Sequence, residues 1–149
     1  MYLFTPYLII DNEMMTALCL AAKRGVDVRI VTPNIPDKKI IFYVTQSYYH
    51  QLVDAGIKIY QFAPGFLHAK CYVSDDKIAT VGTINMDYRS LYLHFECGVY
   101  LYGASAVAAI KEDFCETMKE SILINEKLMR HRLPMRLFQS VLRLFAPML

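Results

Sequence analysis

The sequence predicts an α/β fold built in layers, and three observations lead to this prediction. Strand-like and helix-like segments alternate twice within the first 56 residues, four further strand-like runs follow from Ile57, and a helix-like segment begins near Ser105. Such alternation is typical of helices packed on a central sheet. With 149 residues, of which 55% are hydrophobic, the chain is long enough to bury one core, and its composition argues against disorder.

The first half of the chain contains two predicted strand and helix pairs. Residues 2–10 form an apolar run that indicates a buried strand, and Asp11 can cap a helix that ends at Gly25. Residues 26–31, VDVRIV, alternate apolar and polar side chains as a second strand does. After a proline-containing loop, apolar residues at helical spacing between Ile41 and Ala55 predict a second helix.

The second half changes to consecutive strands. Four strand-like runs are expected, at residues 57–62, 66–74, 77–82 and 92–102. The polar tetrapeptide from Ser74 to Lys77 predicts a tight turn between the second and the third of these runs. A third helix is expected from about Ser105.

Polar residues stand out in the second of these runs, FLHAKCYVS. Because side chains alternate along a strand, His68 and Lys70 share one face, opposite the apolar face. The next run ends in Gly82, Thr83 and Asn85. A glycine lets the backbone approach a ligand closely, and threonine and asparagine offer neutral donors beside a lysine. We therefore expect a site for a phosphate oxyanion.

A carboxylate, Glu96, lies in the last apolar run. Burying a carboxylate is costly unless it has a partner, and an imidazole is a natural one. If the carboxylate accepts a hydrogen bond from one ring nitrogen of His68, this fixes the tautomer and leaves the other nitrogen free as a nucleophile or an acid.

The pattern His68-x-Lys70-x4-Asp75, followed by Gly82-Thr83-x-Asn85, resembles the HKD signature of the phospholipase D superfamily. Longer stretches, among them SYYHQLVDAGIKIYQFAPGFLHAK and ATVGTINMDYRSLYLHFE, resemble the C-terminal half of bacterial cardiolipin synthases. The resemblance extends from Thr5 to about Ile122. It implies a mixed central β-sheet with helices on both faces, which is the α/β/α sandwich of phospholipase D-like proteins.

The resemblance also implies roles for individual residues. It implies catalysis by His68, Lys70 and Asp75, phosphate binding by Lys70, Thr83 and Asn85, and orientation of the histidine by Glu96. From the residues alone, Asp75 is better explained as a turn residue, because it points to the opposite face from Lys70. No metal and no cofactor is expected.

The reaction that the resemblance implies transfers a phosphatidyl group between two phosphatidylglycerols through a phosphohistidine. It needs two histidines, and the chain has one such motif, so His68 is expected to be the proton donor and acceptor. A second half could come from an identical chain or from an amino-terminal half. A homodimeric phosphodiesterase or nuclease, and an inactive truncated fragment, remain open as alternatives.

Charge is distributed unevenly along the chain. Residues 1–126 carry 11 Lys and Arg against 14 Asp and Glu, a net charge of −3, and residues 127–149 carry five basic residues and no acidic one, a net charge of +5. We expect a catalytic domain over 1–126, whose negative charge disfavours nucleic acid as a partner.

The basic segment 127–149 is expected to form an amphipathic tail. After Pro134, its helix would carry Arg136, Gln139, Ser140 and Arg143 on one face. Such a helix can lie on an anionic membrane surface, or it can dock on the body or on a partner half. With no transmembrane segment evident in the sequence, the expected location is peripheral, on the bacterial cytoplasmic membrane.

Overall fold

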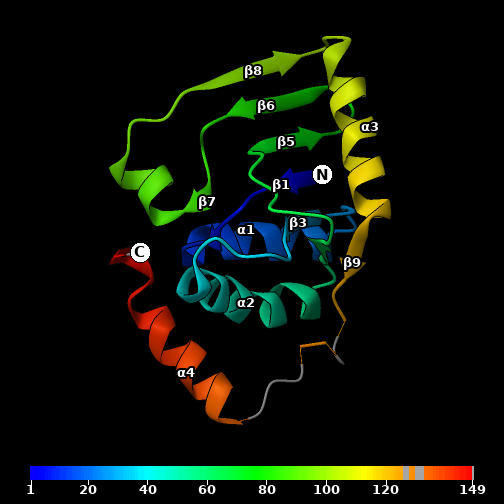
Figure 1. Cartoon of the computed structure of the whole chain (residues 1–149). Coiled ribbons are helices and arrows are strands. Elements are labelled where there is room, and N and C mark those ends of the chain that lie inside the picture. The colour runs from blue at the N-terminus through cyan, green and yellow to red at the C-terminus, as the bar shows by residue number, and fades with distance from the viewer. Residues whose placement is uncertain (126–127, 130–132, 149) are drawn as a thin grey trace.

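The chain is built around a mixed seven-stranded β-sheet with helices on both faces (Figure 1). A computed structural model describes residues 1–125, 128–129 and 133–148, and of Leu133 and Arg136 only the backbone. The strands of the sheet lie in the order β8-β6-β5-β1-β3-β4-β9. The predicted fold class is therefore confirmed.

The first half of the chain forms the parallel part of the sheet. Its elements are β1 (Tyr2–Phe4), β2 (Leu8–Ile9), α1 (Asn12–Lys23), β3 (Arg29–Pro33), α2 (Lys39–Asp54) and β4 (Lys58–Phe62). β1, β3 and β4 are parallel neighbours. Both crossovers move across the sheet in the same direction, so their right-handedness places α1 and α2 on one face.

The second half adds antiparallel strands at both ends of this parallel group. Its elements are β5 (Cys71–Ser74), β6 (Ile78–Gly82), β7 (Met86–Asp87), the π-helical turn η1 (Arg89–Leu93), β8 (Gly98–Tyr102), α3 (Ala106–Lys119), β9 (Ser121–Leu123), α4 (Leu133–Leu144) and the short 3-10 helix η2 (Ala146–Met148). β5 pairs antiparallel with β1, and β6 and β8 extend the sheet beyond it.

Three predicted strands differ from the structure, and of these the run at 66–74 is a strand only from Cys71. The run at 2–10 is broken after Phe4, because Pro6 lacks an N–H for the ladder, and β2 pairs instead with β7 in a separate small sheet. The run at 92–102 is a strand only from Gly98. Before it the chain turns through η1, where Asp87 accepts a hydrogen bond from the backbone N of Ser90 at 2.7 Å.

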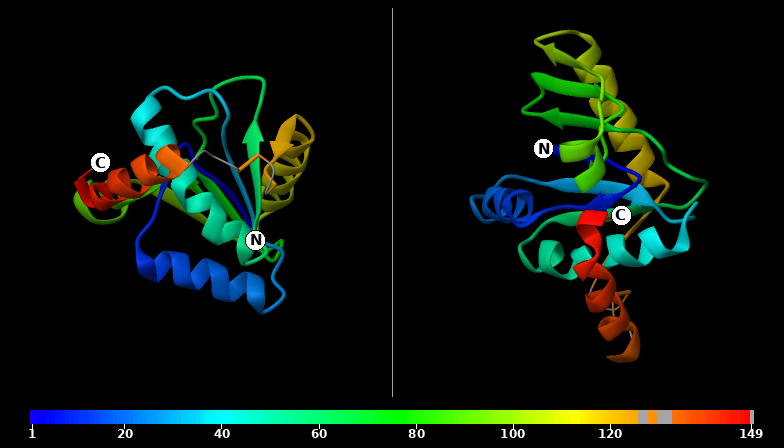
Figure 2. Two further views of the ribbon diagram at one scale, coloured as in Figure 1. Left: turned by 90° about the horizontal axis from the view of Figure 1, so that it is seen from below. Right: turned by 90° about the vertical axis from the view of Figure 1, so that its left-hand side faces the viewer.

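Apolar cores fill both sides of the sheet. Residues of α1 and α2 pack in one cluster, and α3 covers the opposite face, where the ring of Phe114 stacks on Phe4 with a centroid distance of 3.6 Å. The left panel of Figure 2 shows α3 on one side of the sheet and α1, α2 and α4 on the other. The helix α1 begins as predicted, because the side chain of Asp11 accepts from the Met14 N–H at 2.7 Å.

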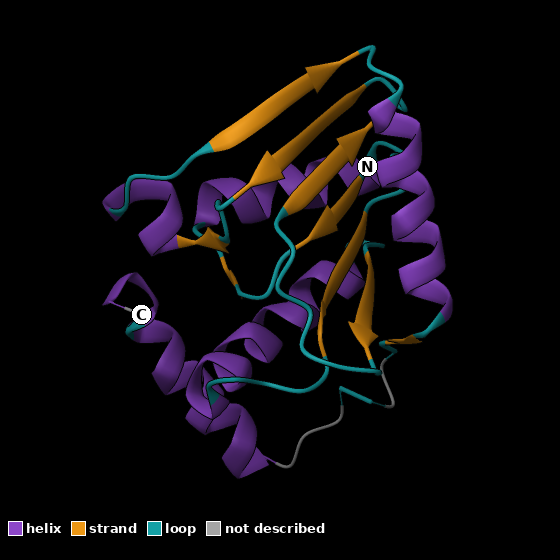
Figure 3. Cartoon of the chain, turned by 45° about the horizontal axis from the view of Figure 1, so that its top comes forward, coloured by secondary structure: helices purple, strands orange, loops and turns teal. Residues whose placement is uncertain are grey.

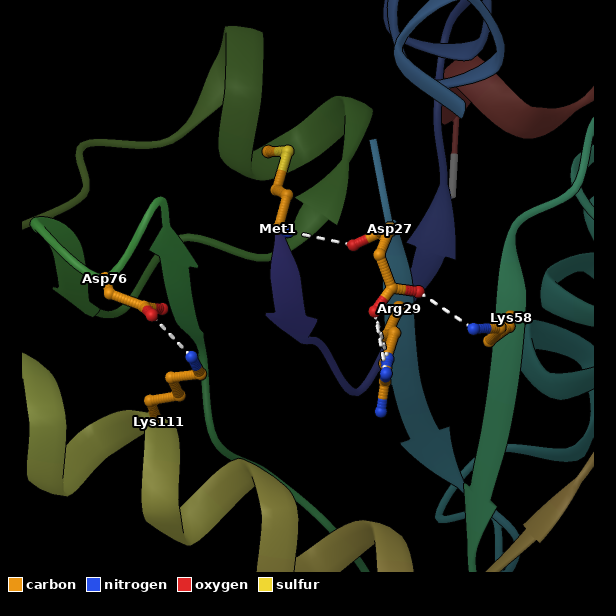
Figure 4. A network of polar contacts seen from close by, with 6 residues as sticks. All are labelled: Met1, Asp27, Arg29, Lys58, Asp76 and Lys111. Carbon is orange, nitrogen blue, oxygen red and sulfur yellow. Dashed lines mark hydrogen bonds and ion pairs between the residues drawn. The ribbon is translucent and has the colours of Figure 1, made fainter. Parts of the chain in front are cut away.

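A polar network ties the starts of the three parallel strands together (Figure 4). The carboxylate of Asp27 bonds Arg29 at 2.8 Å and Lys58 at 3.0 Å, and its backbone carbonyl accepts from the amine of Met1. The hydrogen bond from Arg29, partly offset by burial, and the contact with Lys58 lower the pKa of Asp27 to about 2. The network lies at the opposite ends of these strands from the candidate site described below.

We expect Asp27→Asn to lower the free energy of unfolding by about 1 kcal/mol at pH 7, after allowance for the exposure of the pair. Because the pKa of Asp27 is depressed in the folded state, its contribution is complete above about pH 4 and is lost as the pH falls through about 2. Urea unfolding at several pH values measures this. Glu116→Gln, which breaks the exposed pair with Lys119, is the control and should change stability by less than about 0.5 kcal/mol. An equal loss for Asp27→Asn at pH 2 and pH 7 would contradict the expectation.

Candidate active site at the carboxyl edge of the sheet

His68 and Lys70 lie in the connection between β4 and β5, not within a strand as the sequence predicted. Because β5 pairs with β1, this connection passes the carboxyl ends of β3 and β1 before it enters the sheet (Figure 3). Regular pairing starts just after it, with a hydrogen bond of 3.1 Å from Gly82 N to Lys70 O. The two side chains therefore project at the edge of the sheet where parallel strands end.

The structure brings together the side chains that the sequence predicted for an oxyanion site. A surface cavity of about 460 Å³ is lined by His68, Lys70, Gly82, Thr83 and Asn85. They come from two segments, the entry to β5 and the exit from β6, which antiparallel pairing places side by side. The cavity is open, so a phosphodiester could reach it from solvent.

The surroundings of His68 favour its neutral form. Burial lowers its pKa, the positive charge of Lys70 lowers it further, and Asp37 opposes both effects. The ring of Phe66 lies against the imidazole, with a centroid distance of 5.4 Å. At neutral pH the imidazole of the open site is therefore mostly uncharged.

Lys70 supplies positive charge beside this imidazole. Its Nζ donates a hydrogen bond of 2.8 Å to the backbone carbonyl of His68, which holds the ammonium next to the cavity. Burial lowers the pKa of Lys70, while Glu96 and Asp87 raise it. The group can therefore attract a phosphate oxygen, as the sequence suggested.

Glu96 takes partners that the sequence did not predict. Its carboxylate accepts a hydrogen bond from the hydroxyl of Thr83, and within the described residues no hydrogen bond joins it to the ring of His68. Hydrogen bonds from Thr83 and then Ser90 lower the pKa of Glu96. Ser90 Oγ also accepts from Asn85 Nδ2 at 3.2 Å, so the network continues to the cavity wall. The orienting role of Glu96 toward His68 stays a prediction.

Gly82 lines the cavity and also serves strand packing, and the close approach of a ligand there stays a prediction. A Cβ at this position would lie 2.6 Å from the Cα of Gly98 and also against the carbonyl of Cys97, on the neighbouring strand segment. Next to it, Thr83 N donates to Cys97 O at 2.9 Å, and Cys97 N donates to Thr83 Oγ1 at 3.0 Å. This close approach holds Thr83 beside Glu96.

Asp75 lies away from the cavity. It has a positive φ of 52° and occupies the turn between β5 and β6 together with Asp76, whose φ is 56°. It lies five positions after Lys70 along extended chain, about 16 Å away at ~3.3 Å per residue. The geometry favours the turn role expected from the residues alone, and a catalytic role for Asp75 rests only on the resemblance.

Three residues near the site were missed by the sequence analysis. Phe66 contacts the ring of His68, Ser90 links Asn85 to Glu96, and Asp37 lies within electrostatic range of His68. Strand alternation could have pointed to Phe66, two residues before the histidine. Ser90 and Asp37 come from segments whose position depends on the tertiary fold, and no local pattern marks them.

Comparison with known proteins agrees with this geometry. Residues 1–118 match the family described as cardiolipin synthase, PLD-like domain. The chain belongs to this family. Its resemblance to the phospholipase D superfamily, carried by the motif around His68, is thereby confirmed.

Relatives of this phospholipase D-like chain are longer than it is. It is 51% identical over 149 residues to an uncharacterized protein of Streptococcus mutans serotype c, covering 99% of the chain and 32% of that protein. It is 42% identical to a cardiolipin synthase of Geobacillus sp. (strain WCH70), covering 99% of the chain and 30% of that protein. The chain thus spans about a third of the length of these curated relatives.

A solved structure supports the fold of this cardiolipin synthase-like chain. The phospholipase D family member Nuc from Salmonella typhimurium superimposes with a TM-score of 0.70 at 19% identity, covering 83% of this chain and 80% of Nuc.

Within the described residues, no cluster of three or more His, Cys, Asp or Glu side chains could hold a metal ion. A metal-free site stays a prediction.

The titration of His68 tests the electrostatics of the site. We expect its pKa, followed by NMR of the imidazole, to lie below 6.5 and to rise in Lys70→Met, because removal of a neighbouring positive charge favours the imidazolium. The matched control is Lys77→Met, in the turn between β5 and β6, which should leave this pKa unchanged. A fall or no change in Lys70→Met would show that the two groups do not interact.

Replacement of Gly82 tests the strand contact. Gly82→Ala should destabilise the chain by about 3 kcal/mol, because the added methyl meets backbone atoms that cannot move aside cheaply. Gly65→Ala, where a Cβ would meet nothing within 4 Å, should change stability by less than about 1 kcal/mol. Chemical unfolding of both variants measures the difference, and equal stabilities would refute the close approach.

Proposed function

We propose that the chain is one half of a phospholipase D-type phosphatidyltransferase that transfers a phosphatidyl group between two phosphatidylglycerols. The observation that supports this most directly is the common cavity that His68, Lys70, Thr83 and Asn85 line. An imidazole and an ammonium beside the amide of Asn85 suit a phosphodiester, in which negative charge is spread over several oxygens. The hydroxyl of Thr83 would have to leave Glu96 before it could donate to this group. The family and the cardiolipin synthase relatives favour a lipid substrate.

In the proposed first step, a histidine of a second half attacks phosphorus, and the bond from phosphorus to the glycerol oxygen breaks. His68, as imidazolium, gives its proton to the departing oxygen. In the second step, neutral His68 takes the proton of a hydroxyl of another phosphatidylglycerol. That oxygen attacks phosphorus, the bond to the phosphohistidine breaks, and cardiolipin forms. Lys70 stabilises the negative charge in both steps.

The depressed pKa of His68 fits this cycle once substrate is present. In the open site, burial and Lys70 keep the imidazole mostly neutral at pH 7. A bound phosphodiester adds a negative charge next to the ring, and this raises the pKa of His68 toward the protonated form that the first step needs. As base for the second step, the same group must then return to the neutral form.

A second half would close the open side of the cavity. Beside Glu96, Phe95 is fully exposed, and Tyr92 and Leu93 of η1 are mostly exposed. Exposed apolar side chains in such a group mark an interaction surface. We propose that either a second copy of this chain or a separate amino-terminal half covers this rim and contributes the second histidine.

A nuclease built from the same half-site is supported less well. The likeness to Nuc concerns the fold alone, and residues 1–126 carry a net charge of −3 (11 basic against 14 acidic), which repels nucleic acid. Several matching relatives are named cardiolipin synthases. The nuclease is therefore an outcome to test rather than a second proposal.

The test measures cardiolipin formed from phosphatidylglycerol by mass spectrometry, in parallel with hydrolysis of DNA. We expect wild-type chain to form cardiolipin and His68→Ala to lose at least about 1000-fold of this activity, because no group remains to move the proton. The matched control is His50→Ala, since His50 is exposed on α2 and pairs with Asp54 at 3.0 Å. It should keep wild-type activity.

The solution mass, measured alongside, shows how the second half is supplied. Cardiolipin formation by a dimer supports completion by a second copy. DNA hydrolysis that depends on His68 without cardiolipin formation would support the nuclease instead. Inactivity of the wild-type chain in both assays would exclude completion by a second copy. Inactivity that persists after a separate amino-terminal half is added would support an inactive fragment and contradict the proposal.

A further inference from the structure

Helix α4 docks on the body with its polar side inward. Gln139 is 5% exposed and Ala146 of η2 is 2% exposed, and Leu142 packs against the core between the sheet and α2. The helix was expected to carry a polar face with Arg136, Gln139, Ser140 and Arg143. Of these, Gln139 and Arg143 are directed at the protein, whereas Ser140 is exposed. Of the other basic residues of the tail, Lys127, Arg130 and Arg132 lie outside the described residues, as does the side chain of Arg136.

Polar contacts with α2 hold this orientation. The guanidinium of Arg143 lies over the ring of Tyr48, 4.2 Å from its centroid, and donates to Gln51 Oε1 at 3.4 Å. On the flank of α4, Phe138 meets Tyr43 edge to ring with a centroid distance of 6.2 Å. A rotation of α4 about its axis would break these contacts.

The outward side of α4 is consequently apolar. We call it the outer face, and its members are Leu137, Val141, Leu144, Phe145 and Met148 of η2. Residues 137, 141, 144 and 145 follow the helical repeat, so they form one stripe. Leu137 is 67% exposed and Leu144 is 78% exposed. A stripe of this kind, held outward by polar contacts, marks an interaction surface rather than a core.

We propose that the outer face of α4 inserts into the interfacial layer of a bilayer that contains anionic phospholipid. This inference deepens the proposed function, on which it rests for the presence of a lipid substrate. The partner is the membrane surface itself, recognised by apolar burial together with negative headgroup charge.

Length and charge favour a membrane surface over other partners. A helix of 12 residues is about 18 Å long, which suits a position within the interface. No helix among the described residues is long and apolar enough to cross the bilayer. Residues 127–149 carry five basic and no acidic residues, whereas residues 1–126 are net negative. An anionic surface therefore attracts the tail segment and repels the rest of the chain, which orients the protein.

This orientation brings the candidate site toward the lipid. Leu142 of α4 and Tyr88, the residue before η1, pack against the same core. Both Figure 1 and the right panel of Figure 2 show the end of α4 close to η1, on the side where the carboxyl edge of the sheet lies. A bilayer against the outer face would thus lie beside the opening where a phospholipid headgroup must enter.

The experiment uses sedimentation of the full chain with vesicles of phosphatidylglycerol and phosphatidylcholine, and with vesicles of phosphatidylcholine alone. Wild type should bind the anionic vesicles, and binding should weaken at high salt. The double variant Leu137→Gln, Leu144→Gln should bind them at least about tenfold more weakly, because two apolar side chains no longer enter the interface. Leu20→Gln, at an exposed leucine of α1 outside the outer face, is the matched control and should bind as wild type.

Three results would overturn the inference. These are equal binding by the double variant and wild type, equal binding of wild type to neutral and anionic vesicles, and loss of self-association by the double variant with unchanged vesicle binding. The last would assign the outer face to contacts between copies. Circular dichroism checks that both variants remain folded. Absence of cardiolipin formation with intact vesicle binding counts against the proposed function alone, so the two failures are distinguishable.

Discussion

One backbone hydrogen bond, from Gly82 N to Lys70 O, joins the two parts of the candidate site. It belongs to the antiparallel register of β5 and β6, in which Cys71 lies opposite Val81. The turn sets this register, since Asp75 and Asp76 both adopt the positive φ that matches the twist of paired strands. A slip by one residue would turn every side chain to the other face and separate the lysine from Thr83 and Asn85.

The polar groups of the site are held by one another before any ligand arrives. Thr83 and Ser90 donate to Glu96, and Ser90 accepts from Asn85, so these side chains have fixed positions. Such preorganisation lowers the cost of arranging dipoles around a developing charge. The Thr83 hydroxyl already donates a hydrogen bond to Glu96. The charged group that is placed at the cavity for a phosphate oxygen is therefore the ammonium of Lys70.

Two of the apolar surfaces that the described residues expose differ in kind. The rim of Tyr92, Leu93 and Phe95 adjoins the site, whereas the outer face lies on α4, which contacts the body through Gln139 and Arg143. The polar network around Asp27 joins the starts of the parallel strands. The stabilising network and the candidate site therefore lie at opposite ends of these strands.

Local sequence patterns were enough to predict most of the fold and the residues that line the cavity. Helical and strand periods, the Asp11 cap and the spacing from His68 to Asn85 are properties of neighbouring residues, so they are readable from the sequence alone. The tertiary structure alone decided that Glu96 bonds Thr83, that η1 replaces a strand, and that α4 turns its apolar stripe outward. These features depend on which distant segments pack together. A carboxylate can accept a hydrogen bond from any donor that the fold brings near it, and an apolar stripe can pack against any apolar surface.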